Sequence, residues 1–123
     1  MIEDPVTVYH NPRCSKSRAV LALLEERGIP ARVVEYLKHP PGHDEIRRLL
    51  GQLGMSAGDL VRRNEAVCKE QFGGRDMKEP DWLQALVDFP ILIERPIVVV
   101  GSRAVVARPP ERVLDILAES PGR

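Results

Sequence analysis

The chain reads VTVYHNPRCSKSR over residues 6–18. Alternating Val, Thr and Tyr predict a short β-strand over residues 6–10, and Asn11-Pro12 ends it, because proline cannot donate to a sheet. Cys14 follows directly and begins an amphipathic helix, whose apolar residues recur at helical spacing up to Gly28. The segment therefore predicts a strand, a turn and a helix, with a cysteine at the start of the helix.

The position of Cys14 favours a reactive thiol. The first N–H groups of a helix have no intrahelical partner and the helix dipole is positive there, so both stabilise a thiolate. Arg13, Lys16 and Arg18 add positive charge around the sulfur. An inert, buried cysteine is the alternative for a small core. We predict that Cys14 is a nucleophile with a pKa below that of a free thiol, about 8.5.

Composition limits the class of protein. The 123 residues fit one domain, which we place at residues 1–123, and 43% hydrophobic with only 4% aromatic content predicts an aliphatic core. Basic and acidic residues number 18 each, so no charge excess indicates binding to nucleic acid or to an acidic membrane. No apolar run is long enough to span a membrane, and residues 1–4 lack a signal-peptide start. We expect a cytoplasmic monomer.

The remaining pattern predicts an α/β domain. Residues 32–36 read as a second strand, parallel to the first because a helix joins the two. Residues 43–89 predict an insert made of helices, before strands return at 96–100 and 103–106 around a Gly-Ser turn. A last helix is expected to begin at Arg108. This order predicts a thioredoxin-like fold: a small mixed four-stranded sheet flanked by helices, with a helical insert between the second and third strands.

Several residues are expected to cap helices. Ser15 and Ser17 offer hydroxyl groups at the start of the first helix. Ser56 is expected to begin a short helix, with Asp59 in the capping-box position. Pro80 suits the first turn of another helix, because its missing N–H would have no partner there.

The second cysteine is not placed to assist the first. Ser17 occupies the position that a second cysteine has in a C-x-x-C motif, so the thiol that resolves Cys14 must come from elsewhere. A phosphatase-type loop would need arginine where the chain has Val20. Cys68 lies next to acidic residues, which raise a thiol pKa, and without a secretion signal we expect no disulfide. We interpret Cys68 as a non-catalytic thiol that is exposed or half-buried.

Arginines recur at the junctions between segments, at Arg62, Arg95 and Arg108. Each alone could be a solvated surface charge. Arg95 is the strongest candidate for a function, because Pro96 after it begins a strand where a cis peptide bond is plausible, and a thioredoxin-like fold places that turn beside the cysteine. A guanidinium there can bind two oxygens of a tetrahedral oxyanion at once.

Histidines give weaker signals. His10 precedes Cys14 by four residues and could tune the thiolate or carry protons, and a packed histidine at a strand end is an equally good interpretation. His39 and His43 lack the further ligands of a metal site, so we expect no metal. No glycine-rich phosphate loop is present, and we expect no tightly bound cofactor.

Four segments together resemble the ArsC family, the glutaredoxin-linked arsenate reductases. In chain order they are YHNPRCSKSR (9–18), LVRRN (60–64), PILIERPIVV (90–99) and RPPERVLDIL (108–117). They occur in the family's order and span nearly the whole chain. The resemblance implies that Cys14 is the nucleophile with His10 nearby, and that Arg62, Arg95 and Arg108 bind arsenate.

The resemblance also implies a mechanism and partners. The Cys14 thiolate attacks arsenate, glutathione captures the adduct as co-substrate, and glutaredoxin reduces the mixed species. Two alternatives stay open. One is a glutathione-linked thiol/disulfide oxidoreductase of the same fold. The other is an Spx-like regulator that binds RNA polymerase without catalysis, although such proteins usually carry C-x-x-C where this chain has Ser17.

Overall fold

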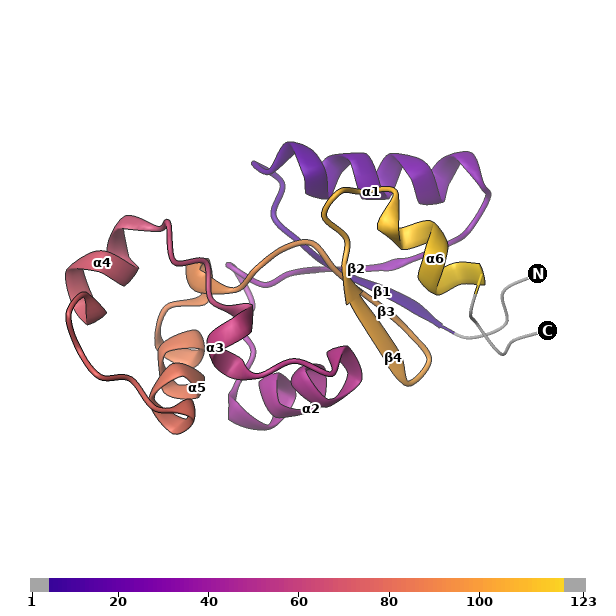
Figure 1. The fold of residues 1–123 in the computed structure, drawn as a ribbon. Coiled ribbons are helices and arrows are strands. Elements are labelled where there is room, and N and C mark those ends of the chain that lie inside the picture. Colours follow the sequence, from indigo (N-terminus) through magenta and orange to yellow (C-terminus); the bar gives the residue numbers. More distant parts are fainter. Residues whose placement is uncertain (1–4, 119–123) are drawn as a thin grey trace. The chain divides into compact units, whose positions relative to one another are not determined.

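A computed structural model describes residues 5–118, which form two compact units (Figure 1). The first, here called the sheet unit, comprises residues 5–39 and 95–118. The second, here called the helical unit, is Pro40–Glu94. The prediction that residues 1–4 lack a signal-peptide start concerns a segment outside the described residues. No helix among the described residues is long and apolar enough to cross a membrane.

The sheet unit contains a mixed sheet of four strands. They are β1 (Val6–His10), β2 (Arg32–Glu35), β3 (Ile97–Val100) and β4 (Arg103–Val106). Their spatial order is β2-β1-β3-β4, with β1 and β2 parallel and the other two pairs antiparallel. Val100 pairs with Arg103, so β3 and β4 form the expected hairpin around a two-residue turn. The predicted fold class is confirmed.

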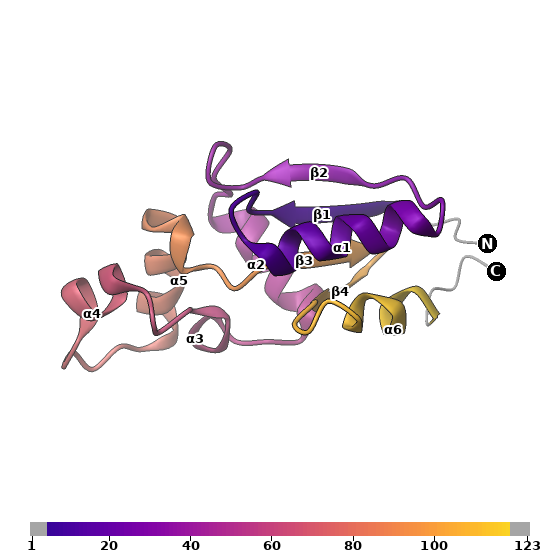
Figure 2. The same cartoon turned by 90° about the horizontal axis from the view of Figure 1, so that it is seen from above.

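Two helices of the sheet unit lie on the same face of this sheet, α1 (Ser15–Glu26) and α6 (Arg112–Ala118) (Figures 1 and 2). The core beneath them is aliphatic and fully buried, and it includes Val8, Val20, Val98 and Val113. Because the apolar positions of β1, α1, β3 and α6 meet there, burial of these side chains fixes the end of β1 against the start of α1.

The last helix begins later than its sequence predicts. We expected it at Arg108, and α6 begins at Arg112. The preceding residues form tighter turns, in which the N–H of Arg112 donates to the carbonyl of Pro109 at 3.0 Å and that of Val113 to Pro110 at 3.1 Å. Arg108 and Pro109 each precede a proline, and a residue before proline is disfavoured in the helical conformation, so the chain turns before it becomes helical. Arg108 is therefore in a connection.

The helical unit confirms the predicted insert between β2 and β3. It contains α2 (His43–Leu53), α3 (Ala57–Leu60), α4 (Ala66–Phe72), α5 (Glu79–Asp88) and the short 3-10 helix η1 (Pro90–Leu92). Ser56 caps α3 by accepting the N–H of Asp59 at 3.1 Å, and Pro80 lies in the first turn of α5, as expected. Ile46, Leu60 and Leu86 are fully buried within this unit.

Candidate active site

A tight turn carries the chain from β1 to Cys14. Asn11 is buried, its carbonyl oxygen accepts the N–H of Cys14 at 2.9 Å, and its side-chain oxygen accepts the N–H of Arg13 at 3.0 Å. Asparagine at the first position and proline at the second suit such a turn, because the amide bonds to the backbone and the ring presets φ. Asn11 and Pro12 therefore determine where the cysteine enters the helix.

Cys14 itself is the N-cap residue of α1, with φ −93° and ψ 121°. The prediction that Ser15 and Ser17 cap the helix is wrong, because the turn ends at Cys14 and both serines lie inside the first helical turn. Ser17 is fully buried, and its hydroxyl oxygen accepts the N–H of Asn11 over 3.4 Å. This contact ties the end of β1 to the first turn of α1.

Opposing effects act on the Cys14 thiol. Partial burial on its own would raise its pKa, whereas the backbone N–H groups of Ser17 and Lys16, then a hydrogen bond and the positive charge of Arg95, lower it. The lowering effects together prevail, and the pKa of Cys14 is about 7. About half of Cys14 is therefore thiolate at neutral pH.

The positive charge at the sulfur has a different source from the one expected. We expected the side chains of Arg13, Lys16 and Arg18 to supply it. Arg18 instead donates from Nη1 to the carbonyl oxygen of Pro12 at 2.8 Å, and Lys16 acts through its backbone N–H. The guanidinium that lowers the thiol pKa belongs to Arg95, immediately before β3.

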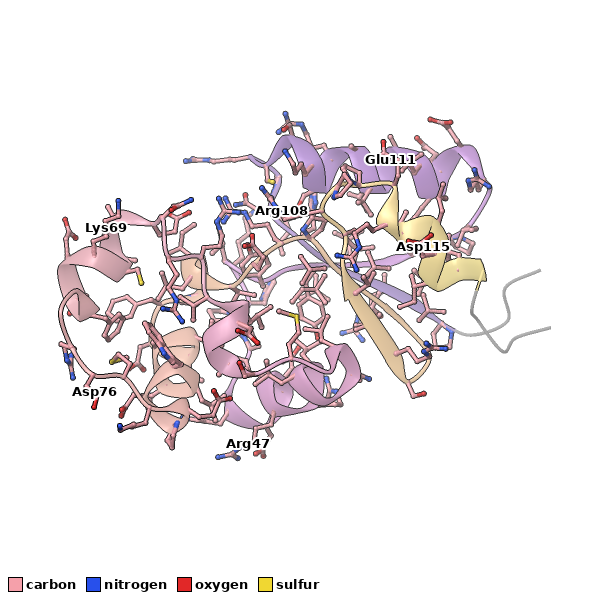
Figure 3. The ribbon with its side chains drawn as sticks, viewed as in Figure 1. Arg47, Lys69, Asp76, Arg108, Glu111 and Asp115 are labelled. Atoms are coloured by element: carbon pink, nitrogen blue, oxygen red, sulfur yellow. The ribbon has the colours of Figure 1, made fainter. Side chains whose placement is uncertain are left out.

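A second arginine lies close to the sulfur. Arg108 is in the connection between β4 and α6 (Figure 3), and its Nη1 lies 4.0 Å from Sγ of Cys14. The same nitrogen donates to the carbonyl oxygen of Arg95 at 3.1 Å. The peptide bonds Arg95–Pro96 and Arg108–Pro109 are both cis. Three separate segments thus bring Cys14, Arg95 and Arg108 together, an arrangement suited to holding an oxyanion against a thiolate.

His10 is the last residue of β1 and is buried, opposite Glu35 of β2. Burial lowers its pKa, the Glu35 carboxylate raises it and Arg18 lowers it, with a net lowering. The imidazole is therefore neutral near pH 7. Its Nδ1 has no hydrogen-bond partner among the described residues, and a role in proton transfer stays a prediction.

Arg62 belongs to the helical unit, where its guanidinium is bound by two carboxylates. Nη1 donates to Oε1 of Glu94 at 2.8 Å, and Nε lies 3.3 Å from Oε2 of Glu65. Sequence reasoning missed both partners. Glu65 is only three positions from Arg62, a local spacing that could have signalled the pair, whereas the order of residues offers no signal for Glu94, 32 positions away. Cys68 was expected to be exposed or half-buried, and this is wrong: it is a free thiol on α4 of the same unit and is buried, 5% exposed.

Comparison with known proteins identifies the family. The model of the ArsC family matches residues 9–116, and the chain belongs to this family. It is 48% identical over 114 residues to an uncharacterized protein, YfgD, of Escherichia coli K12, covering 91% of this chain and 96% of that protein. It is 43% identical over 114 residues to a Neisseria meningitidis serogroup A protein named arsenate reductase, covering 91% and 97%.

Solved structures agree. The structure of an arsenate reductase from Vibrio cholerae superimposes with a TM-score of 0.87 at 44% sequence identity, covering 93% of this chain and 98% of that one. The family resemblance of the four sequence segments is thereby confirmed.

Proposed function

We propose that the protein is an arsenate reductase in which Cys14 is the single nucleophile and glutathione and glutaredoxin are the reductants. The observation that carries this proposal is the placement of two guanidinium groups, from Arg95 and Arg108, at a thiol whose pKa is about 7. A thiolate among cations suits attack on an anionic oxyacid. The relatives named arsenate reductase support the choice of substrate.

The first step forms a covalent adduct. The Cys14 thiolate attacks arsenic(V), a sulfur–arsenic bond forms, and one oxygen leaves as water after protonation. Arg95 and Arg108 bind the remaining oxygens and stabilise their negative charge, because guanidinium N–H groups form short, charge-assisted hydrogen bonds to oxyanions. Following the family resemblance, we assign Arg62 as a third arsenate ligand.

The second step transfers two electrons. The thiolate of glutathione attacks the sulfur of Cys14, the sulfur–arsenic bond breaks, and its electron pair stays on arsenic, which leaves as arsenite. Cys14 is left in a mixed disulfide with glutathione. A glutaredoxin thiolate attacks the glutathione sulfur and releases the Cys14 thiolate, and a second glutathione then regenerates glutaredoxin. The sum is one arsenate and two glutathione molecules converted to arsenite, glutathione disulfide and water.

A second candidate is a glutathione-linked thiol/disulfide oxidoreductase. It is favoured by the pKa of Cys14 of about 7, since thiol–disulfide exchange is fastest when the attacking thiol has a pKa near the ambient pH. The two candidates share Cys14 and the glutathione adduct, and they differ in whether the arginines bind an oxyanion in the first step.

A coupled assay separates the two. NADPH consumption is followed with glutathione, glutathione reductase and glutaredoxin, using arsenate or a glutathionylated peptide as substrate. We expect arsenate-dependent turnover that Cys14→Ser abolishes and that stops when glutaredoxin is omitted. Turnover of the peptide alone would replace the proposed function by the second candidate. Turnover of neither substrate would contradict both and would favour a binding module.

A further inference from the structure

Arg62 and Glu94 are held together by the backbone of the helical unit. Val61 forms an isolated antiparallel bridge with Ile93. On either side of it, the N–H of Arg62 donates to the carbonyl of Leu92 at 2.7 Å and the N–H of Glu94 donates to that of Leu60 at 2.9 Å. These backbone hydrogen bonds hold the main chains of Arg62 and Glu94 side by side, so their side chains start from fixed neighbouring positions.

The guanidinium of Arg62 is already engaged by negative charge. Glu94 accepts a 2.8 Å hydrogen bond from Nη1, and Glu65 lies 3.3 Å from Nε on another edge. The side chains of Arg62, Glu65 and Glu94 are 20%, 26% and 29% exposed. Arg62 thus lies close to two carboxylates in a partly shielded setting, where electrostatic effects exceed those of a fully exposed ion pair.

This arrangement opposes the binding of a dianion. Arginine attracts a tetrahedral oxyanion through its charge and through its paired N–H groups. Here Glu94 occupies one N–H group of the guanidinium, and both carboxylates repel a further anion that approaches Arg62. The N–H groups that remain can still donate, but an oxyanion that accepts from them approaches two carboxylates as well.

We propose that Glu94 is a specificity-determining residue that competes with oxyanions for Arg62 and weakens the binding of tetrahedral dianions, with Glu65 acting in the same direction. The inference rests on the proposed function for the assignment of Arg62 as an oxyanion ligand, and it adds a limit on the charge of the substrate. In this proposal Glu94 acts through Arg62.

Calorimetric titration with sulfate tests this directly. Sulfate is tetrahedral and stays dianionic throughout the neutral pH range, so its own titration does not interfere. We expect Glu94→Gln to tighten sulfate binding about fivefold and Glu65→Gln to tighten it less, because the Glu65 contact is longer. Glu70→Gln on α4 removes an equal charge from an exposed position of the same unit and should leave affinity unchanged.

A double variant shows whether Glu94 acts through Arg62. In an Arg62→Gln background, Glu94→Gln should no longer tighten sulfate binding. A merely structural role of Glu94 would not produce this dependence. Because Glu65→Gln probes the same competition, the test survives a folding defect in the Glu94 variant.

Three results would overturn the inference. Unchanged or weaker sulfate binding in Glu94→Gln would mean that Glu94 orients Arg62 or is structural. Tighter binding that persists without Arg62 would mean that Glu94 acts elsewhere. Sulfate binding by none of the variants would mean that Arg62 is not an oxyanion ligand. The proposed function is judged separately, since arsenate turnover that depends on Cys14 could fail while this competition is observed.

Discussion

Arg108 donates a hydrogen bond from Nη1 to the backbone carbonyl oxygen of Arg95 over 3.1 Å. The side chain of one candidate ligand is thus anchored on the backbone of the other, beside Cys14.

We predict that Arg108→Ala weakens the apparent affinity for arsenate about 10-fold, because a charge-assisted donor to the oxyanion is lost. The measurement is KM in the coupled assay. Arg112→Ala, at an exposed position of α6, should match the wild type; equal effects of both substitutions would refute a specific role for Arg108.

Replacing Arg95 by lysine separates geometry from charge. Arg95→Lys keeps one positive charge near the sulfur but loses the fork that presents two parallel donors to an oxyanion. We expect kcat/KM for arsenate to fall at least about 10-fold in Arg95→Lys and further in Arg95→Ala. Wild-type kcat/KM in the lysine variant, with a loss only in the alanine variant, would show that Arg95 acts as a diffuse charge.

The turn before Cys14 contributes to the reactivity of the thiol. Asn11→Ala removes the side-chain acceptor of the Arg13 N–H, so the turn loosens and the sulfur loses alignment with the N–H groups of Lys16 and Ser17. We predict that the pKa of Cys14 rises by about half to one unit. The pH dependence of iodoacetamide alkylation measures this shift. Asn64→Ala, the same substitution at an exposed position, is the control, and identical midpoints for both would disprove the role of Asn11.

The lowered pKa of Cys14 also predicts a pH dependence of stability. In the folded state the thiol ionises near pH 7, below the value of about 8.5 for a free thiol, so between these values the unfolded state binds more protons. Relative to Cys14→Ser, the free energy of unfolding should therefore increase as pH rises from about 7 to about 9, and the gain should be lost as pH falls through 7. Urea unfolding of both proteins across this range checks the sign. Parallel pH profiles would contradict it.

Local patterns were sufficient to predict much of the fold. The alternation over residues 6–10, the Gly-Ser turn between β3 and β4, and the Ser56 cap of α3 depend on residues that are neighbours in the chain. The cis peptide bond at Arg95–Pro96 was expected for the same kind of reason. Two predictions failed because an adjacent residue had a stronger effect than the pattern used. The turn hydrogen bond from the N–H of Cys14 to the carbonyl of Asn11 makes Cys14 the N-cap of α1, where serines were expected. Two prolines delay the start of α6 from Arg108 to Arg112.

Less of the candidate site than of the fold could be predicted from the sequence. The position of Cys14 at a helix N-terminus follows from its own segment, but the charge that acts on it comes from Arg95, which only the folding of the sheet brings near. The pairing of Arg62 with Glu94 could not be predicted for a related reason. It is created by the bridge between Val61 and Ile93, a contact without any periodic signal.

The most direct test of the account is the titration of Cys14 in the Cys68→Ser protein, where Cys14 is the only thiol. Thiolate absorbance in the ultraviolet is followed against pH, with the Cys14→Ser, Cys68→Ser protein as the blank. The account predicts a midpoint near 7, set by the helix N–H groups and by Arg95 against the opposing effect of burial. A midpoint at or above about 8.5, the value of a free thiol, would contradict the claim that this site is built around a stabilised thiolate.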